Sequence, residues 1–333
     1  YQDSLTTPSC LLGTIATDLH NAVAAPAAVG EPENIKRVAG GLSPGGSCMP
    51  GAKMIGGIIA ILVLIILAIF LTPAKWSFLG MKGKVAFIGA HTTASIEDSS
   101  DVGYMKLRDY LHDHGYELVQ LQAPRIRLED LQMYDACIMF PPSSALDKDE
   151  IDALHRYVEN GGGLLICGEG WALDKLDYLN NITKDWGFLF MNTKVYEPEQ
   201  TQTDYGVSVS QYTVAALGLV EGNPIASRIT YPYIMRNSCT INITDRDKVT
   251  KAITLKGYAF GENYYHQDLK PTKGHGEPVG EDAVVMVSGE IGQGRVVGMG
   301  GHDLYMNKWI FQSKPAENAK SMVYILDWLT KHT

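Results

Sequence analysis

The sequence predicts an α/β protein in which a doubly wound, mainly parallel sheet is preceded by one transmembrane helix. From residue 84 onward, short apolar runs alternate with amphipathic helix patterns, as in parallel sheets covered by helices on both faces. Residues 54–72 carry no charged side chain, and a bilayer-spanning helix needs roughly 20 such residues. The part of the chain after this run is long enough for one large domain with its own core.

The composition divides the chain into four parts. Residues 1–53 are rich in Ala, Gly, Pro and Ser and predict a poorly ordered, low-complexity tail. Residues 54–72 form the predicted transmembrane helix, and residues 73–83 form a juxtamembrane linker. Residues 84–333 predict a single α/β domain with an irregular insertion around residues 190–282. The sequence leaves open whether the tail is a functional part of the protein.

The apolar run predicts a single-pass membrane protein with the lipid bilayer as a partner. A buried core helix, a cleaved signal peptide and a pilin-like helix are the alternatives, and the signal peptide fits less well because its apolar region is shorter. Basic residues flank both ends of the run, so the positive-inside rule gives no orientation. The N-x-T triplets at Asn181 and Asn242 favour an extracytoplasmic domain.

Charge and cysteine usage exclude several classes of function. The net charge is −9 and no basic run occurs, which argues against a nucleic-acid partner. The five cysteines form no CxxC pair, so we expect no zinc or other metal site and no cofactor. Cys137 and Cys167 lie inside apolar runs and predict buried thiols. Cys10 and Cys48 could form a disulfide if the tail is extracellular, which the sequence leaves open.

The expected elements of the domain alternate along the chain. Strands are expected at residues 84–90, 117–121, 136–140, 164–167, 283–288 and 294–299, and helices at residues 104–115, 128–133, 147–160 and 316–331. The helix at residues 147–160 has the clearest signals. Asp147 is its expected N-cap, Glu150 follows three residues later as in a capping box, and Gly161 ends the helix.

Three stretches of this domain carry a family resemblance. They are YDACIMFPPSSALDKDEIDALHRYVENGGGLLICGEG (residues 134–170), GQGRVVGMGGHDLYMN (residues 292–307) and the closing helix that contains Asn318 and ends in DWL. Together they resemble class I glutamine amidotransferase-like domains, closest to the noncatalytic branch of GldG-type and DUF4350 proteins. The resemblance covers residues 84–333 and implies a flavodoxin-like fold. It also implies a binding or assembly subunit of a membrane complex, with other membrane-complex subunits as partners.

One segment departs from the pattern of that branch. Where the family often has Asp-Ser-Asp, this chain has Gly301-His302-Asp303, which keeps only the last acidic position. Asn307 keeps the position of the family's trailing asparagine. In the resembling branch the cysteine position is commonly apolar, which implies that acyl-transfer chemistry is absent.

A catalytic alternative uses Cys167 and His302. Both follow predicted parallel strands, at the edge where doubly wound sheets place their sites. An imidazole beside a thiol can remove its proton and leave a nucleophilic thiolate, and Glu169 or Asp303 could orient the ring. The alternative function is therefore a Cys–His hydrolase or amidotransferase-like enzyme. Against it, Gly168-Glu169-Gly170 follows the cysteine, which is not the usual nucleophile turn.

A polar loop after the first strand is the best candidate for contact with a ligand. Residues 89–101 are rich in Ser, Thr and Asp and should lie at the same sheet edge as the ends of the later strands. An ordinary solvated loop is the alternative. The ligand would be a small polar molecule or a glycan, which makes a glycan-binding module a further candidate function. The candidate ligand-binding residues are His91, Thr92, Thr93, Pro141, Glu169, Asp303 and Asn307.

Overall fold

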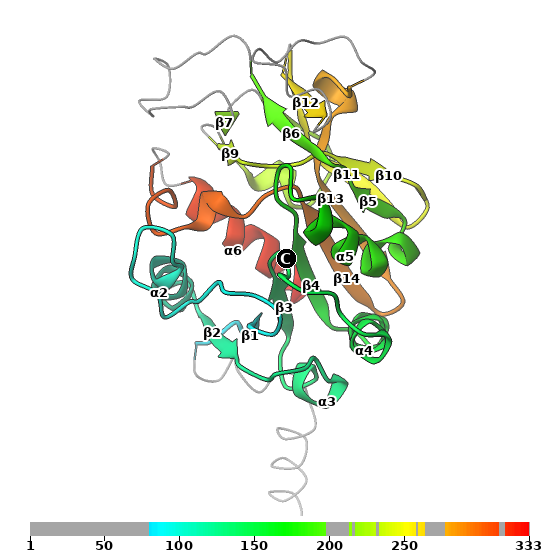
Figure 1. Cartoon of the computed structure of the whole chain (residues 1–333). Coiled ribbons are helices and arrows are strands. Elements are labelled where there is room, and N and C mark those ends of the chain that lie inside the picture. Colours follow the sequence, from blue (N-terminus) through cyan, green and yellow to red (C-terminus); the bar gives the residue numbers. More distant parts are fainter. Residues whose placement is uncertain are drawn as a thin grey trace, which may run out of the picture. The chain divides into compact units, whose positions relative to one another are not determined.

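The computed structural model describes residues 80–197, 213–214, 217–230, 233–257, 259–263, 277–312 and 317–332 (Figure 1). These residues belong to one compact unit. The expected tail at residues 1–53, including Cys10 and Cys48, and the apolar run at residues 54–72 lie outside the described residues.

Five parallel strands form one side of the main sheet. In spatial order they are β2 (Tyr116–Leu121), β1 (Gly83–Ile88), β3 (Ala136–Met139), β4 (Gly163–Cys167) and β14 (Gly294–Met299). Each is a run of four to six residues, and all except the half-buried edge strand β2 are almost fully buried, as expected where helices cover both faces of a parallel sheet. The predicted α/β fold with a parallel central sheet is therefore confirmed, and the bounds of β14 match the predicted strand.

Antiparallel strands extend this sheet beyond β14 to ten strands. They are β13 (Val284–Ile291), β10 (Ile241–Ile243), β5 (Phe188–Phe190), β11 (Val249–Leu255) and β8 (Leu217–Leu219). Two small separate sheets pair β12 (Phe260–Asn263) with β6 (Thr193–Tyr196) and β7 (Thr213–Val214) with β9 (Met235–Arg236). The described part of the region around residues 190–282, expected to be irregular, thus contains the strands from β6 to β12 together with turns and short 3-10 helices.

Helices cover both faces of the sheet. They are α2 (Met105–Asp113), α3 (Leu128–Leu131), α4 (Lys148–Glu159), α5 (Leu173–Thr183) and α6 (Glu317–Leu329). Because side chains alternate along a strand, Val85 and Phe87 of β1 pack in the core shared with α2 and α6. Ala86 and Ile88 point the other way, into the core shared with α3, α4 and α5. This two-sided arrangement is the expected doubly wound one.

The helix signals at α4 are borne out. The Asp147 side chain accepts a hydrogen bond from the backbone N–H of Glu150, and the Glu150 side chain accepts one from the backbone N–H of Asp147. Helix α5 was not expected from the sequence. Its N-cap, Ala172, makes no side-chain capping bond, so the usual start signal is missing.

The membrane predictions need correction. Among the described residues, no helix is long and apolar enough to cross a membrane. Helix α6 has 13 residues, which gives about 20 Å against a hydrocarbon core of about 30 Å. The transmembrane helix, the single-pass membrane location with an extracytoplasmic domain, and the lipid bilayer as a partner are therefore unsupported and are not carried further.

Asp327 links the last helix to distant parts of the chain. Its buried carboxylate accepts hydrogen bonds from Tyr116 Oη (2.7 Å), Lys82 Nζ (3.0 Å) and Arg228 Nη2 (2.7 Å). Burial alone would raise the pKa of Asp327, but these three hydrogen bonds outweigh it and lower the pKa. The carboxylate therefore stabilises the fold above its unfolded pKa of about 3.9, and this stabilisation is lost as the pH falls through the lower folded pKa.

We predict that Asp327→Asn lowers the free energy of unfolding at pH 7 by about 1–3 kcal/mol, because buried charge-assisted hydrogen bonds are lost. Urea denaturation would measure this, and the difference from wild type should shrink at pH 3. Asp152→Asn is the matched control, since Asp152 makes only an exposed ion pair with Lys148 and should stay within about 0.5 kcal/mol. Equal effects of the two substitutions would contradict the prediction.

Candidate active or binding site at the carboxyl edge of the sheet

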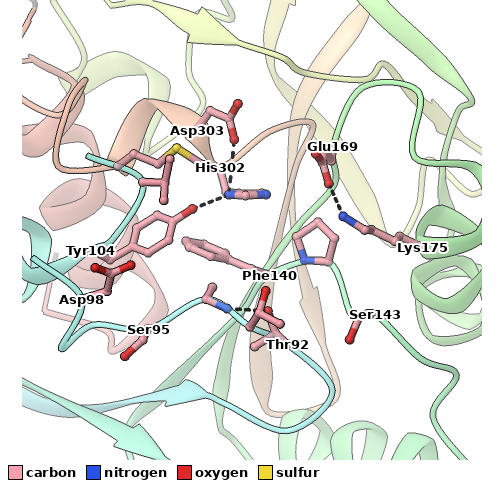
Figure 2. A pocket seen from close by; sticks show the side chains of 15 residues that line it. Thr92, Ser95, Asp98, Tyr104, Phe140, Ser143, Glu169, Lys175, His302 and Asp303 are labelled. Atoms are coloured by element: carbon pink, nitrogen blue, oxygen red, sulfur yellow. Dashed lines mark hydrogen bonds and ion pairs between the residues drawn. The ribbon is translucent and has the colours of Figure 1, made fainter. Parts of the chain in front are cut away.

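A pocket of about 290 Å³ lies at the carboxyl ends of the central strands (Figure 2). After β1 the chain continues to α2 on one face of the sheet, and after the neighbouring strand β3 it continues to α4 on the opposite face. In open α/β sheets, ligands bind in the crevice between two such loops that lead to opposite faces. The volume suits a small molecule. The lining residues are Thr92, Thr93, Ala94, Ser95, Asp98, Val102, Tyr104, Phe140, Pro141, Ser143, Glu169, Lys175, His302, Asp303 and Met306.

The side chain of His302 is held in the pocket by contacts with two aromatic residues. Its Nδ1 lies 2.7 Å from Tyr104 Oη, and its ring stacks on Phe140 with 4.7 Å between ring centroids. Burial lowers the pKa of His302 and raises the pKa of Tyr104 well above its ordinary value. The phenol therefore keeps its proton and the imidazole is neutral, so the ring carries no positive charge. When the phenol donates to Nδ1, the N–H of the imidazole lies on Nε2, where it can donate to a ligand.

Carboxylates dominate the charge of the pocket. Glu169 pairs with Lys175 at 2.8 Å. Asp303 lies beside the imidazole of His302, and burial raises the pKa of Asp303 although His302 opposes the shift. The pKa of Asp98 is lowered by hydrogen bonds from the backbone and hydroxyl of Ser100. Three carboxyl groups against one lysine favour a hydroxylated or cationic ligand over an anionic one.

Asn307 positions the pocket loop without lining the pocket. Its Oδ1 accepts from the backbone N–H of Lys106 (2.8 Å), and its Nδ2 donates to the backbone carbonyls of Asp98 (2.8 Å) and Ser100 (2.7 Å). The side chain is buried. Asn307 was predicted to bind the ligand. In the structure its side chain instead holds the segment between Asp98 and Lys106 in place.

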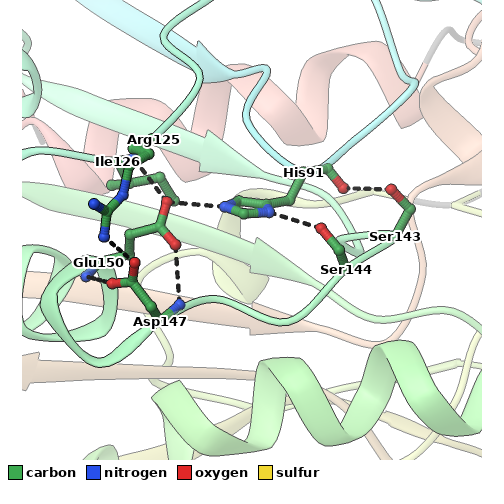
Figure 3. A network of polar contacts seen from close by, with 7 residues as sticks. All are labelled: His91, Arg125, Ile126, Ser143, Ser144, Asp147 and Glu150. Carbon is green, nitrogen blue, oxygen red and sulfur yellow. Dashed lines mark hydrogen bonds and ion pairs between the residues drawn. The ribbon is translucent and has the colours of Figure 1, made fainter.

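His91 follows β1 immediately before the lining residue Thr92 and does not itself line the pocket. Its ring bridges Ser144 Oγ (2.8 Å from Nδ1) and Glu150 Oε1 (2.8 Å from Nε2) (Figure 3). The remaining predicted ligand-binding residues, namely Thr92, Thr93, Pro141, Glu169 and Asp303, all line the pocket. The polar loop after the first strand is thus at the sheet edge where the sequence analysis placed it.

Cys167 and His302, the candidate catalytic pair, occupy different environments. Cys167 is fully buried within β4 and packs in the core on the face of α2 and α6. Burial raises its thiol pKa well above the ordinary value, and Cys239 adds to this shift. The thiol does not line the pocket that contains His302 and Glu169. A cysteine nucleophile must lose its proton and must be accessible to the substrate. The raised pKa of the Cys167 thiol opposes the first requirement, and its burial opposes the second.

Several lining residues had no signal in the sequence. In the sequence, Tyr104 and Phe140 have no mark beyond that of ordinary core aromatics, and both are indeed buried. Their contacts with His302, through the phenol oxygen of Tyr104 and the ring of Phe140, are between residues far apart in sequence. Lys175 lies on α5, which the sequence did not predict. Within the described ranges, no group of three or more His, Cys, Asp or Glu side chains could hold a metal ion.

Comparisons with known proteins support the fold and not a function. No protein-family model matches the chain, and no curated protein matches it. Among solved structures, the mmIFT52 N-terminal domain superposes with a TM-score of 0.56 at 15% identity, covering 74% of this chain and 97% of that one. At this identity the likeness establishes a shared α/β fold alone.

Two further solved structures show weaker similarity. A putative ThuA-like protein from Bacteroides uniformis gives a TM-score of 0.43 at 16% identity, over 75% of this chain and 91% of its own. The cytoplasmic protein STM3548 from Salmonella typhimurium gives 0.43 at 15% identity, over 74% and 98%.

The environment of His302 predicts a pH-dependent contribution to stability. Because the folded pKa of His302 lies below its unfolded value of about 6.5, the unfolded chain binds more protons as the pH falls, and acid destabilises the fold. Between pH 7.5 and 5.5, wild type should therefore lose more free energy of unfolding than His302→Gln, by at most about 1.4 kcal/mol per pH unit. Parallel urea titrations would measure this. Identical pH slopes would show that the histidine titrates normally.

Proposed function

We propose that this protein is a binding domain with a flavodoxin-like, amidotransferase-like fold, that it captures a small polar ligand in the pocket at the sheet edge, and that it acts as a subunit of a protein complex. The observation that carries the proposal is that Cys167 is fully buried and does not line the pocket. The pocket keeps a neutral histidine and three carboxyl groups, while the only cysteine of the expected catalytic pair lies inside the sheet.

The finer assignment of the fold has two supports. The spatial order of the five parallel strands, second-first-third-fourth-fifth in chain order, is that of flavodoxin-like sheets. The motifs at residues 134–170 and 292–307 resemble the noncatalytic amidotransferase-like branch, and they form β3, α4, β4, β14 and the start of the segment after β14. The role as a complex subunit rests on this resemblance.

The chemistry of the pocket wall supports a hydroxylated or cationic ligand. Hydroxyls of Thr92, Thr93 and Ser95 and the carboxylate of Glu169 can exchange hydrogen bonds with sugar-like hydroxyl groups. Nε2 of His302 adds one donor, while the Phe140 ring that stacks on His302 is buried. A glycan-binding module is the second candidate function, and this mixture of hydroxyls and carboxylates favours it.

The absence of thiol chemistry can be tested by alkylation. We predict that N-ethylmaleimide leaves Cys167 unmodified in the native protein and modifies it in urea, because the thiol is buried and its pKa is raised. Peptide mass spectrometry would separate Cys167 from the other cysteines. Rapid native alkylation that His302→Gln suppresses would instead support the Cys–His enzyme.

Ligand class can be tested with two sugars of opposite charge. We predict that glucosamine, a cation near pH 7, shifts amide NMR signals of the pocket loop at lower concentration than glucuronate does. Glu169→Gln should weaken glucosamine binding by about tenfold, the equivalent of about 1.4 kcal/mol, whereas Glu129→Gln, at an exposed site away from the pocket, should not. Equal responses to both sugars, or no response at all, would count against this pocket.

A further inference from the structure

Ser144, His91 and Glu150 form a continuous chain of side chains outside the pocket (Figure 3). Ser144 Oγ lies 2.8 Å from His91 Nδ1, and His91 Nε2 lies 2.8 Å from Glu150 Oε1. Hydroxyl, imidazole and carboxylate in this order are the parts of a serine nucleophile, its base and the group that orients the base. Ser144 lies in the loop after β3, His91 in the segment after β1, and Glu150 in the first turn of α4.

The hydrogen bonds of Glu150 determine the tautomer of His91. Glu150 Oε1 also accepts from the backbone N–H of Ile126 (3.0 Å), and Oε2 accepts from the backbone N–H of Asp147 (3.0 Å). The carboxylate is buried and acts as an acceptor toward both main-chain donors. His91 Nε2 therefore supplies the proton in its contact with Glu150, and the lone pair of Nδ1 faces the Ser144 hydroxyl. This is the orientation that a general base requires.

The backbone around His91 is held in an uncommon conformation. His91 has φ of 60°, a left-handed conformation that residues with a side chain seldom adopt. The Ser143 hydroxyl donates to the carbonyl of His91 at 2.8 Å, and the Ser143 backbone N–H donates to the same oxygen. Such strain persists where surrounding contacts fix it and is concentrated at functional sites. These two hydrogen bonds of Ser143 hold the loop that carries Ser144 against His91.

Solvent exposure decreases from Ser144 through His91 to Glu150, as a serine nucleophile with a shielded carboxylate requires. Ser144 is exposed, the His91 side chain is 16% exposed, and the Glu150 side chain is 3% exposed. A substrate in solution can therefore meet the hydroxyl while the carboxylate stays shielded from water. The site adjoins the pocket, since Thr92 and Ser143, the chain neighbours of His91 and Ser144, line it.

We propose that Ser144 is the nucleophile of an acyl-transfer site that hydrolyses small carboxylic esters, with His91 as its base and Glu150 as a positioning residue. Ser144 Oγ forms a bond to the ester carbonyl carbon while His91 Nδ1 takes the hydroxyl proton. The carbon–oxygen bond to the alcohol then breaks, and the alcohol leaves with the proton from His91. Water, activated by the same imidazole, cleaves the acyl-serine and releases the carboxylic acid. This activity is independent of ligand binding in the pocket.

The test uses the full chain and a fluorophosphonate that carries a fluorescent reporter. Attack by Ser144 forms a phosphorus–oxygen bond and releases fluoride, which leaves a stable adduct. We expect one adduct, located at Ser144 by peptide mass spectrometry and lost in Ser144→Ala. His91→Asn, chosen because asparagine tolerates the left-handed backbone, should slow labelling at least tenfold. Ser227→Ala, an exposed serine outside both the network and the pocket, should label like wild type.

A second readout separates positioning from folding. Glu150→Gln should slow labelling of Ser144 at least tenfold, because the group that orients His91 is changed. Asp147→Ala removes the cap of the same helical turn without a contact to His91, so it should lower the free energy of unfolding and leave the labelling rate unchanged. Folded wild type without a Ser144 adduct, or unchanged labelling in folded His91→Asn, would overturn the proposal and make His91 a structural brace. Neither result would affect glucosamine binding, since Ser144, His91 and Glu150 do not line the pocket.

Discussion

Parallel alignment of β1, β3, β4 and β14 forces their following segments to emerge at one edge of the sheet. Because each crossover returns the chain to the opposite edge, residues far apart in sequence are brought together there without any direct attraction between them. Glu169 and His302 share a pocket for this reason. The same alignment brings the segment after β1 against the loop after β3, so that His91 and Ser144 meet. Both polar assemblies thus depend on strand direction before they depend on any side-chain contact.

Burial then decides what each polar group can do at this edge. Desolvation keeps the imidazole of His302 neutral and the phenol of Tyr104 protonated. It also keeps the thiol of Cys167 protonated inside the sheet. The Ser144 hydroxyl, by contrast, is exposed and requires no unusual ionisation, because a neighbouring base can remove its proton during attack. Nucleophile chemistry is therefore better suited to the loop than to the strand.

Much of the fold was predictable because it is encoded locally. The capping box at Asp147 and Glu150 and the apolar run of β14 are short-range signals, and the structure contains both. The partners of Glu150 are not local. His91 lies 59 residues away in sequence, and a carboxylate that already satisfies a helix cap gives no sign that it also binds an imidazole. For Cys167 the signal in the sequence was misleading. Its position at the end of a predicted strand suggested a site, but its side chain lies on a face of the strand that packs in the core.

The position of β14 has a consequence for how the chain acquires its fold. Residues 294–299 insert between β4 and β13, pairing Gly163 with Arg295 across 132 positions of sequence. During synthesis, β4 is complete long before its neighbour exists, and its unpaired main-chain groups form an open sheet edge. Closure of such distant pairs carries a large entropic cost and is slow. The nascent chain therefore carries an unpaired strand edge while residues 168–293 are synthesised, and this edge is exposed to pairing with other chains during that interval.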